Sequence, residues 1–524
     1  MAKNSLQSIS ISDLDTLKDT AAEIVHAAKT GNTDYLDLRL EIGEGIGAYS
    51  EDGHPKVTSK DWNFSLGVRV IDSTGIPAAG YFGQKLGFPD LKNFSRTLKN
   101  AIQIASARAR ANSRDKKSFV AQSSEFGSSI TPTLLAPIDI RQDTVPAEFE
   151  IDPRSVTPAQ ITDLARQTAA AALSFHPYVR RAEVVINTAV SRQLFISSQG
   201  SAIDQSSASS GVTIFVLAQN NKNDTPVDLY HHTGNQLGLE ALTKAKNAHQ
   251  KTAVEFACQI ADEARLLADA KPAPGVDKPA IVVLDPDLIA LFAHEIIGHP
   301  SELDRALKME AGYAGRSWFM SDPKTSVVGK QIGSPLLTAF SDPTLKGGYG
   351  YYLYDDEGTP ARRVYHIKNG VYQEFMNSRQ TAPIINAPPN GHYKANDASV
   401  VPLIRMSVSA IAAGFTDPKK IIADVEHGYY CVGHRIPSIS ESRENFQIAP
   451  RLIYEINHGR LGQVYRDGRL TADSRDFFMS IDAVGNDFKI FPIPNCGKGQ
   501  PIQAKQVGNG GPTARGKAMI ARGK

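Results

Sequence analysis

The chain has 524 residues, of which 41% are hydrophobic and 21% are charged. This composition is typical of a globular protein, and the length exceeds a single domain of about 100–200 residues. Its 57 basic and 55 acidic residues leave a net charge of +2, which gives no electrostatic argument for a nucleic-acid or anionic-membrane partner. The three cysteines, Cys258, Cys431 and Cys496, are too few for a disulfide scaffold and suit a reducing compartment.

Neither a targeting segment nor a membrane span is evident in the sequence. The start, MAKNSLQSISISDLDTLKDT, lacks the apolar core of a signal peptide. No apolar run reaches the ~18 residues of a transmembrane helix. We therefore expect a cytoplasmic protein.

The first half of the chain alternates predicted helices with predicted strands. Helical spacing of apolar residues covers 13–29, 91–111, 158–173 and 237–270, and strand-like alternation covers 35–42, 64–71, 78–82, 179–188, 194–198 and 211–218. The polar segment 113–157 is expected to wrap over the surface. A helix, a strand and a hairpin follow one another twice, which is either a faint internal repeat or a coincidence of strand patterning.

The best candidate for a domain boundary is KPAPGVDKP at 271–279, which has three prolines and a glycine. It divides the chain into an α/β domain of helices and hairpins over 1–270 and a β-rich domain over 271–524. The predicted fold class is therefore α+β.

Turn signals dominate the second half. Asn369-Gly370 lies between alternating strands and predicts a hairpin, because Asn-Gly tolerates the positive φ angles of a type I′ turn. His458-Gly459 and Asp467-Gly468 repeat this signal. One short helix is expected over 417–427, and the Gly- and Lys-rich tail from Gly497 onward is either frayed or a final strand.

A predicted buried helix carries the strongest chemical signal. Residues 280–284 (AIVVL) form an apolar run, and Asp285 then caps a helix over 286–298. This helix contains the sequence His294-Glu295-Ile296-Ile297-Gly298-His299. Zinc binds neutral imidazoles and activates water, and a nearby carboxylate can take the proton. The pattern predicts a zinc protease site with Glu295 as the general base.

The spacing of the two histidines is unusual. The common metalloprotease motif HExxH places them at i and i+4, whereas His294 and His299 stand at i and i+5. On a regular α-helix five residues turn about 140° beyond one full rotation, so both cannot point at one metal. A local π-bulge, or the end of regular helix at Gly298, would bring them together. Gly298 and Pro300 favour the second explanation, in which His299 lies where the helix is already ending. The alternative is a packed helix with two satisfied core histidines.

The chain resembles the TldD/PmbA family of metalloproteases. The family motif HExxGHxxExD is matched by His294, Glu295, Gly298, His299, Glu302 and Asp304. Further matches follow in order at 355–358, 367–370, 376–379, 390–391, 402–405, 484–487 and 496–498, and the N-terminal half fits more loosely. Pro300 and His392 depart from the Gly and Arg that are usual in the family.

This resemblance implies a zinc peptidase in which His294, His299 and Cys496 bind the metal and Glu295 is the general base. It implies an α/β N-terminal domain and a β-rich metal-binding C-terminal domain. The implied assembly is a homodimer or a heterodimer with a related PmbA-like subunit, acting on unfolded peptides or small unstructured proteins. The chain keeps the metal motif that the inactive class of subunits lacks, so we place it with the active class. The alternative is a non-catalytic partner or binding subunit of the same fold with a structural zinc.

Other residues have a chemical and a structural interpretation. Glu302, and with it Asp304, is a candidate to orient a ligand imidazole, since metal-bound histidines donate their second N–H; otherwise both begin a solvated segment. Cys258 and Cys431 are expected to be small core residues, whereas Cys496 is expected on a loop.

Three further features complete the expectations. His231-His232 is expected on a surface loop. His392 and Tyr351 are further candidates for stabilising a transition state. The glycine-rich segment 347–354 is expected to be a flexible entry into a strand that lines the cleft.

Overall fold

The structure, a computed structural model, describes residues 9–28, 33–122, 132–220, 226–245, 251–310 and 315–523. The chain contains both helices and many strands, which confirms the predicted α+β class. None of the helices in these ranges combines the length and the apolar character that crossing a membrane requires.

A curved seven-stranded sheet dominates the first half, in the order β3-β2-β1-β5-β6-β4 with β7 paired to β6. Its strands are β1 (Thr33–Glu51), β2 (His54–Asp72), β3 (Ala78–Lys85), β4 (Gln142–Val145), β5 (Val179–Ser197), β6 (Ala202–Ala218) and β7 (Val227–Asn235). Three of them are 19 residues long, so the prediction of short strands was wrong. The first half of β2 is exposed on both faces, and it therefore has no apolar alternation to read.

Helices cover one face of this sheet. They are α1 (Asp13–Ala27), α2 (Phe88–Lys92), α3 (Phe94–Gln122), η2 (Pro153–Ser155), α4 (Pro158–Ser174), α5 (Glu240–Thr243) and α6 (Ala253–Asp269). The prediction of a single helix over 237–270 was wrong. Thr252 and Glu255 form a capping box that begins α6 separately from α5. Helix α3 also extends into the segment that was expected to be an irregular surface wrap.

The second half contains an eight-stranded sheet in the order β18-β9-β25-β21-β19-β20-β8, with β22 paired to β25. Its members are β8 (Lys271–Pro272), β9 (Ala280–Leu284), β18 (His427–Ile439), β19 (Asn445–Asn457), β20 (Arg460–Arg466), β21 (Arg469–Asp473), β22 (Ala483–Val484) and β25 (Ala514–Ala521). Strand β18 also pairs with β19, which closes β18, β9, β25, β21 and β19 into a ring. The chain's tail is thus a central strand.

A six-stranded sheet, β14-β13-β12-β17-β24-β23, lies beside this ring. Its strands are β12 (Ala339–Ser341), β13 (Val364–Lys368), β14 (Val371–Tyr372), β17 (Val408–Ile411), β23 (Lys489–Lys498) and β24 (Gln503–Gly511). The small pairs β10 (Met320–Asp322) with β11 (Thr325–Ser326) and β15 (Tyr393–Lys394) with β16 (Leu403–Ile404) complete the strands. The remaining helical segments are α7 (Pro286–Phe292), η3 (Ala293–Gly298), η4 (His299–Ser301), α8 (Leu303–Ala306), η5 (Ala382–Ile385), α9 (Pro418–Ala423) and α10 (Ser474–Ser480).

Two of the three predicted hairpin turns are confirmed. Asn369-Gly370 joins β13 to β14 and His458-Gly459 joins β19 to β20, and all four residues have positive φ. Asp467-Gly468 is a turn but not a hairpin, because β20 and β21 each pair with β19 instead of with each other. Helix α10 was not predicted.

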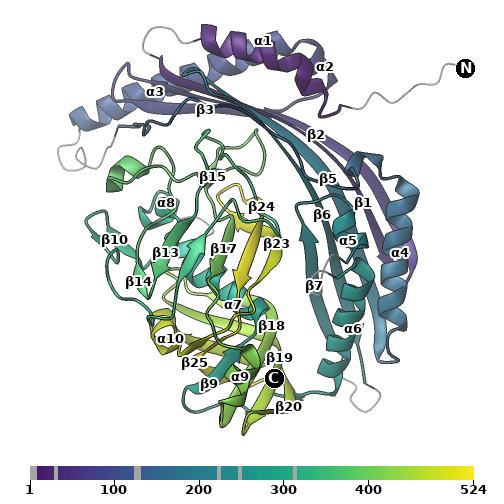
Figure 1. The fold of residues 1–524 in the computed structure, drawn as a ribbon. Coiled ribbons are helices and arrows are strands. Elements are labelled where there is room, and N and C mark those ends of the chain that lie inside the picture. Colours follow the sequence, from purple (N-terminus) through teal and green to yellow (C-terminus); the bar gives the residue numbers. More distant parts are fainter. Residues whose placement is uncertain are drawn as a thin grey trace, which may run out of the picture.

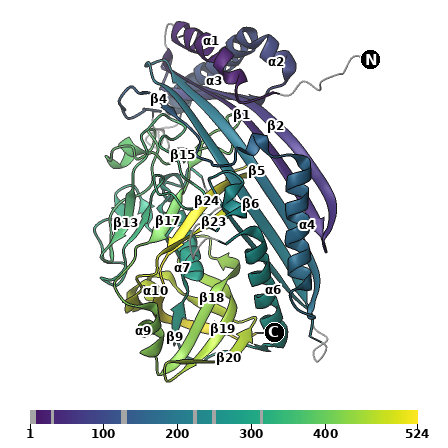
Figure 2. The same ribbon diagram turned by 45° about the vertical axis from the view of Figure 1, so that its right-hand side comes forward.

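The seven-stranded sheet arches over the second half of the chain (Figure 1). In both views α1, α3 and α4 lie on the outer side of the arch, and β23, β24 and α7 lie beneath it (Figures 1 and 2). The arch draws its strands from residues before 236 and the other sheets from residues after 270. The exact division into domains over 1–270 and 271–524 stays a prediction.

Candidate metal centre

The helix that carries the two motif histidines changes its winding at the motif. Asp285 caps α7 as expected, accepting a hydrogen bond from the backbone N–H of Leu288 at 2.9 Å. After Phe292 the helix widens into a π-helix, and the N–H of His299 donates to the carbonyl of His294, five residues earlier. This confirms the first of the two predicted explanations of the spacing. The imidazole rings consequently lie edge to face, with centroids 4.7 Å apart and planes 88° to one another.

Gly298 fits tightly at the end of this π-helix. A Cβ atom there would lie 2.1 Å from Sδ of Met406 and 3.1 Å from Oγ of Ser409. The close approach therefore requires glycine, although its backbone is right-handed helical. Pro300 then lies inside the short 3-10 turn η4 that follows the π-helix.

Cys496 lies in strand β23 and not on the expected loop. The β23–β24 ladder is irregular between Ile493 and Cys496, where Pro494 has no N–H to donate, and it resumes with Cys496 opposite Lys505. The flanking residues Asn495 and Gly497 had suggested a loop that follows the end of a strand at Ile493. The strand nevertheless carries Cys496 to the motif helix.

The structure brings His294, His299 and Cys496 together. Their candidate ligand atoms all lie within 4.8 Å of one another. Sγ of Cys496 is 3.8 Å from Nε2 of His299. The three residues are buried, with 3%, 5% and 4% of their surfaces exposed.

Each imidazole is held from behind through its Nδ1 atom. Nδ1 of His294 lies 2.8 Å from Oδ1 of Asn509, and Nδ1 of His299 lies 3.3 Å from Oε2 of Glu302. These contacts orient the rings and leave the Nε2 atoms for a shared ligand. Glu302 thus contacts the His299 imidazole, and its role in orienting a metal ligand stays a prediction. Asp304 makes no such contact, since its carboxylate binds Lys498 at 2.7 Å and the N–H of Ile404.

Asn509 was missed by sequence reasoning. It lies on β24, 215 residues after His294, and an asparagine between glycines carries no local sign of this contact. Only the pairing of β24 with its neighbours places it beside the motif helix.

Glu302 belongs to a fully buried charged cluster. Its carboxylate lies 2.7 Å from Nη2 of Arg305 and 3.4 Å from Nζ of Lys498, and none of these side chains is exposed. Burial alone would raise the pKa of Glu302, but Lys498, Arg305 and His299 together hold it well below its usual range. Glu302 therefore stays ionised and can accept a hydrogen bond from the Nδ1–H group of His299.

The donor atoms suit a divalent metal of intermediate softness. Burial opposes ionisation of the Cys496 thiol, yet His294 and His299 lower its pKa well below the usual value. Burial likewise disfavours the charged form of His294, whereas Cys496 raises its pKa to about 9. The Cys496 thiol therefore favours the thiolate form beside His294, and a cation could bind this thiolate. One thiolate and two imidazoles form a donor set that zinc prefers.

Glu295 is engaged by an arginine. Its Oε2 atom lies 2.7 Å from Nη1 of Arg443, and the two side chains are 15% and 13% exposed. Arg443 has a φ of 68° in the turn between β18 and β19. Burial would raise the pKa of Glu295, but His299, Arg443 and His294 lower it. The carboxylate is therefore ionised, as a proton acceptor must be.

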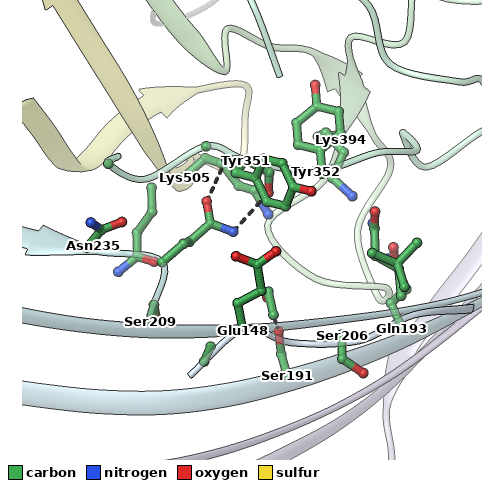
Figure 3. A pocket seen from close by; sticks show the side chains of 18 of the residues that line it. Glu148, Ser191, Gln193, Ser206, Ser209, Asn235, Tyr351, Tyr352, Lys394 and Lys505 are labelled. Atoms are coloured by element: carbon green, nitrogen blue, oxygen red, sulfur yellow. Dashed lines mark hydrogen bonds between the residues drawn. The ribbon is translucent and has the colours of Figure 1, made fainter. Parts of the chain in front are cut away.

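A cavity of about 490 Å³ lies between the arch and the second half of the chain. Polar side chains of the sheet, such as Ser191 and Ser209, face Tyr351 and Lys505 across it (Figure 3). Met406, whose Sδ lies against Gly298, also lines the cavity. The cavity therefore adjoins the motif helix. The segment 347–352 lines it as predicted, but as a loop and not as the entry of a strand.

The expected position of His231 and His232 was wrong. Both lie on strand β7 and not on a surface loop. His231 is buried, and its Nε2 atom lies 3.2 Å from Oδ2 of Asp287. Nε2 of His232 contacts the carbonyl of Pro492. The histidines thus link the arch to the second half of the chain.

The remaining candidates take structural positions. His392 is fully buried, its Nδ1 contacts the carbonyl of Asn390, and burial lowers its pKa to about 3. Cys431 is a core residue as expected, whereas Cys258 on α6 is only partly buried. Burial raises the pKa of both thiols.

Models of one protein family match two parts of the chain. The PmbA/TldA metallopeptidase central domain matches residues 151–267, and the C-terminal domain of the same family matches residues 277–522. Together they cover more than half of the sequence. The chain belongs to the PmbA/TldD family.

Relatives of this PmbA/TldD chain carry the name metalloprotease. One from Methanocaldococcus jannaschii is 26% identical over 495 residues, which are 93% of this chain and 97% of the relative. One from Synechocystis is 26% identical over 521 residues, covering 98% and 99%. A relative from Saccharolobus solfataricus is named a zinc metalloprotease TldD homolog and is 25% identical over 366 residues, covering 70% and 76%.

Solved structures share the fold of this PmbA/TldD chain. A protein from Thermotoga maritima, described as a candidate modulator of a DNA gyrase, has a TM-score of 0.70 at 14% identity and is covered over 97% of this chain and 100% of its own. TldE from Thermococcus kodakarensis has a TM-score of 0.69 at 14% identity, with coverage of 97% and 100%. At these identities the likeness concerns the fold alone.

Proposed function

We propose that the protein is a zinc-dependent peptidase that cleaves unfolded peptides or small unstructured proteins. The observation that carries the proposal is the convergence of His294, His299 and Cys496 from segments about 200 residues apart, with their candidate ligand atoms within 4.8 Å of one another. The naming of family relatives as metalloproteases agrees with it.

The metal would be held by Nε2 of both histidines and by the Cys496 thiolate. Three protein ligands leave a fourth position for water or substrate, as in catalytic zinc sites. When bound, zinc lowers the pKa of a coordinated water and polarises a carbonyl group. Asn509 and Glu302 keep the imidazoles in the orientation that ligation requires, by binding the Nδ1 atoms.

Glu295 would act as the general base. It directly follows the ligand His294 and is ionised, so it can accept a proton from a water beside the ligands and later donate it to the leaving amine. Arg443 must release or share the carboxylate during this transfer, because the two now form a direct ion pair.

The cavity beneath the arch would hold the substrate. Its polar sheet wall offers hydroxyl and amide groups to a peptide backbone, and it reaches the motif helix through Met406. We also propose that the active form is a dimer, either of this chain or with a related PmbA-like subunit. The related TldE chain has the same fold, so light scattering of the chain alone and mixed with such a subunit tests the assembly.

The proposal is tested by metal content and peptidase activity of four proteins. The wild type is expected to bind about one zinc per chain and to cleave a casein-derived unstructured peptide. Cys496→Ser and His299→Ala should lose both zinc and activity, whereas Glu295→Gln should keep zinc and lose activity. A wild type that binds no zinc at saturating metal, or a Glu295→Gln variant that cleaves as fast as the wild type, contradicts the proposal.

One observation favours the alternative of a non-catalytic subunit with a structural zinc. The ion pair with Arg443 occupies Glu295, and a purely structural site needs no free base. The alternative predicts that zinc stabilises the fold while Glu295→Gln changes neither zinc content nor partner binding. Hydrolysis that depends on Glu295 decides between the two.

A further inference from the structure

One cation on the cavity wall has no partner. Among the residues that the structure describes, Nζ of Lys505 makes no hydrogen bond and no ion pair. The side chain lines the cavity between β24 and the arch (Figure 3). An ammonium group surrounded by protein is costly unless an anion accompanies it.

Lys505 lies next to the candidate metal centre. It stands directly opposite Cys496 in the β23–β24 ladder, and residues directly opposite in an antiparallel pair share one face of the sheet with Cβ atoms about 5 Å apart. A group bound by Lys505 is therefore close to the proposed reaction site. This distance suits a substituent on the substrate peptide itself.

The other charged residues around Lys505 are engaged or positive. Lys394 pairs with Asp356, which also binds Arg39 at 2.9 Å. Lys346 pairs with Glu148. Arg405, which also acts electrostatically on Lys505, donates to the carbonyl of Gln503. The charged groups named here are thus either cations or carboxylates that already pair with another cation.

Glu41, on the arch side of the cavity, differs from the acidic residues named above, which pair with cations. It makes no hydrogen bond and no ion pair within the described ranges. Burial raises its pKa, although Lys505 counteracts this, so Glu41 is a weak neutraliser of Lys505. Burial and the nearby Lys394 lower the pKa of Lys505 to about 8, although Asp356 and Glu41 oppose this shift.

We propose that Lys505 binds a carboxylate group of the substrate peptide and thereby selects acidic substrates. The inference rests on the proposed peptidase function and adds a substrate class to it. The carboxylate is either an Asp or Glu side chain or the C-terminus of the peptide, because both present the same group. The neighbouring serines can bind the peptide backbone without regard to charge.

The experiment measures peptide binding to the full-length, zinc-loaded Glu295→Gln protein. Four fluorescent peptides share one unstructured sequence with either Asp or Asn at one position, and each has either a free or an amidated C-terminus. Fluorescence anisotropy at fixed salt gives their dissociation constants for this protein and for versions that also carry Lys505→Gln, Lys505→Glu or Lys489→Gln. Lys489, also on β23–β24 but outside the cavity lining, is the matched control.

Removing the decisive carboxylate should weaken binding about tenfold or more, the value of a charge-assisted hydrogen bond. Lys505→Gln should abolish that difference, Lys489→Gln should keep it, and Lys505→Glu should reverse it, so that the peptide without the decisive carboxylate binds more tightly. Dependence on Asp in amidated peptides identifies a side chain as the source, and dependence on the free C-terminus identifies the terminal group. Equal binding of all four peptides, no binding of any, or an unchanged preference in Lys505→Gln overturns the inference.

Hydrolysis by the protein with Glu295 intact separates this inference from the proposed function. Cleavage of acidic and neutral peptides at equal rates, unchanged by Lys505→Gln, overturns the carboxylate site and leaves the peptidase standing. Carboxylate-selective binding through Lys505 without any hydrolysis supports the site and overturns the peptidase.

Discussion

Replacing Glu302 by Gln tests the buried charges behind the candidate metal centre. Gln keeps the size of the side chain and one acceptor oxygen, but it removes the negative charge. In the native cluster Glu302 and Asp304 balance Arg305 and Lys498, and Glu302 has no exposed surface. After the substitution Arg305 loses its ion pair with Glu302, and Lys498 keeps only its pair with Asp304.

The magnitude follows from this imbalance. Breaking a buried ion pair by removing one partner costs about 3–5 kcal/mol, because the remaining charge is left without compensation. Gln still accepts a hydrogen bond and Lys498 keeps Asp304 at 2.7 Å, so we expect a loss near the lower end, about 3 kcal/mol in the free energy of unfolding. Zinc affinity should fall about 10–100-fold, since His299 loses its ionised acceptor.

Urea unfolding of the metal-free protein measures the first effect, and zinc competition with a chromogenic chelator measures the second. Asp163→Asn on α4 is the control, because Asp163 and its partner Arg166 are 53% and 46% exposed and such an exposed pair contributes little to stability. A Glu302→Gln protein that unfolds within the range of the control and binds zinc like the wild type would refute the argument that these charges support the site.

Three further substitutions have defined outcomes. Arg443→Gln should raise the pKa of Glu295 by removing its cation, so the acidic limb of the kcat/KM profile moves to higher pH; an unmoved limb contradicts the pairing. Gly298→Ala should cost about 1–3 kcal/mol by overpacking against Met406, measured by urea unfolding, and Met406→Ala should recover part of that loss. Arg451→Ala should lower the free energy of unfolding by about 3–5 kcal/mol, because it leaves two buried carboxylates without their cation. These are Asp287, 2.6 Å from Nη1 of Arg451, and Glu263, 2.7 Å from its Nε. A free energy of unfolding within about 1 kcal/mol of the wild type argues against a role of this cluster in joining α6 to α7.

The features that could be predicted are those with local causes. The Asp285 cap and the Asn369-Gly370 turn depend on a few neighbouring residues. The i and i+5 spacing of His294 and His299 narrowed their geometry to a π-bulge or a helix end, because a regular α-helix turns them apart. The local sequence is sufficient in each case.

The features that were missed depend on pairing between distant segments. Nothing near Asn509 marks its contact with His294, since that contact is made by the placement of β24. The motif resemblance implied Cys496 as a ligand, but the flanking residues wrongly suggested a loop. His231 was misplaced because its burial depends on Asp287 and Arg451, which lie far along the chain.

The β23–β24 hairpin links the two proposed binding events. Cys496 and Asn509 from this hairpin reach the motif histidines, while Lys505 lines the cavity. Arg405 ties the two strands together, donating to the carbonyls of Cys496 and Gln503. A slip of β23 by one residue against β24 would turn Cys496 to the opposite face of the sheet, away from the face that carries Lys505. The register of this hairpin therefore determines whether the metal ligand and the proposed carboxylate site lie on the same face. A change that shifts one of the two residues should alter binding at the other.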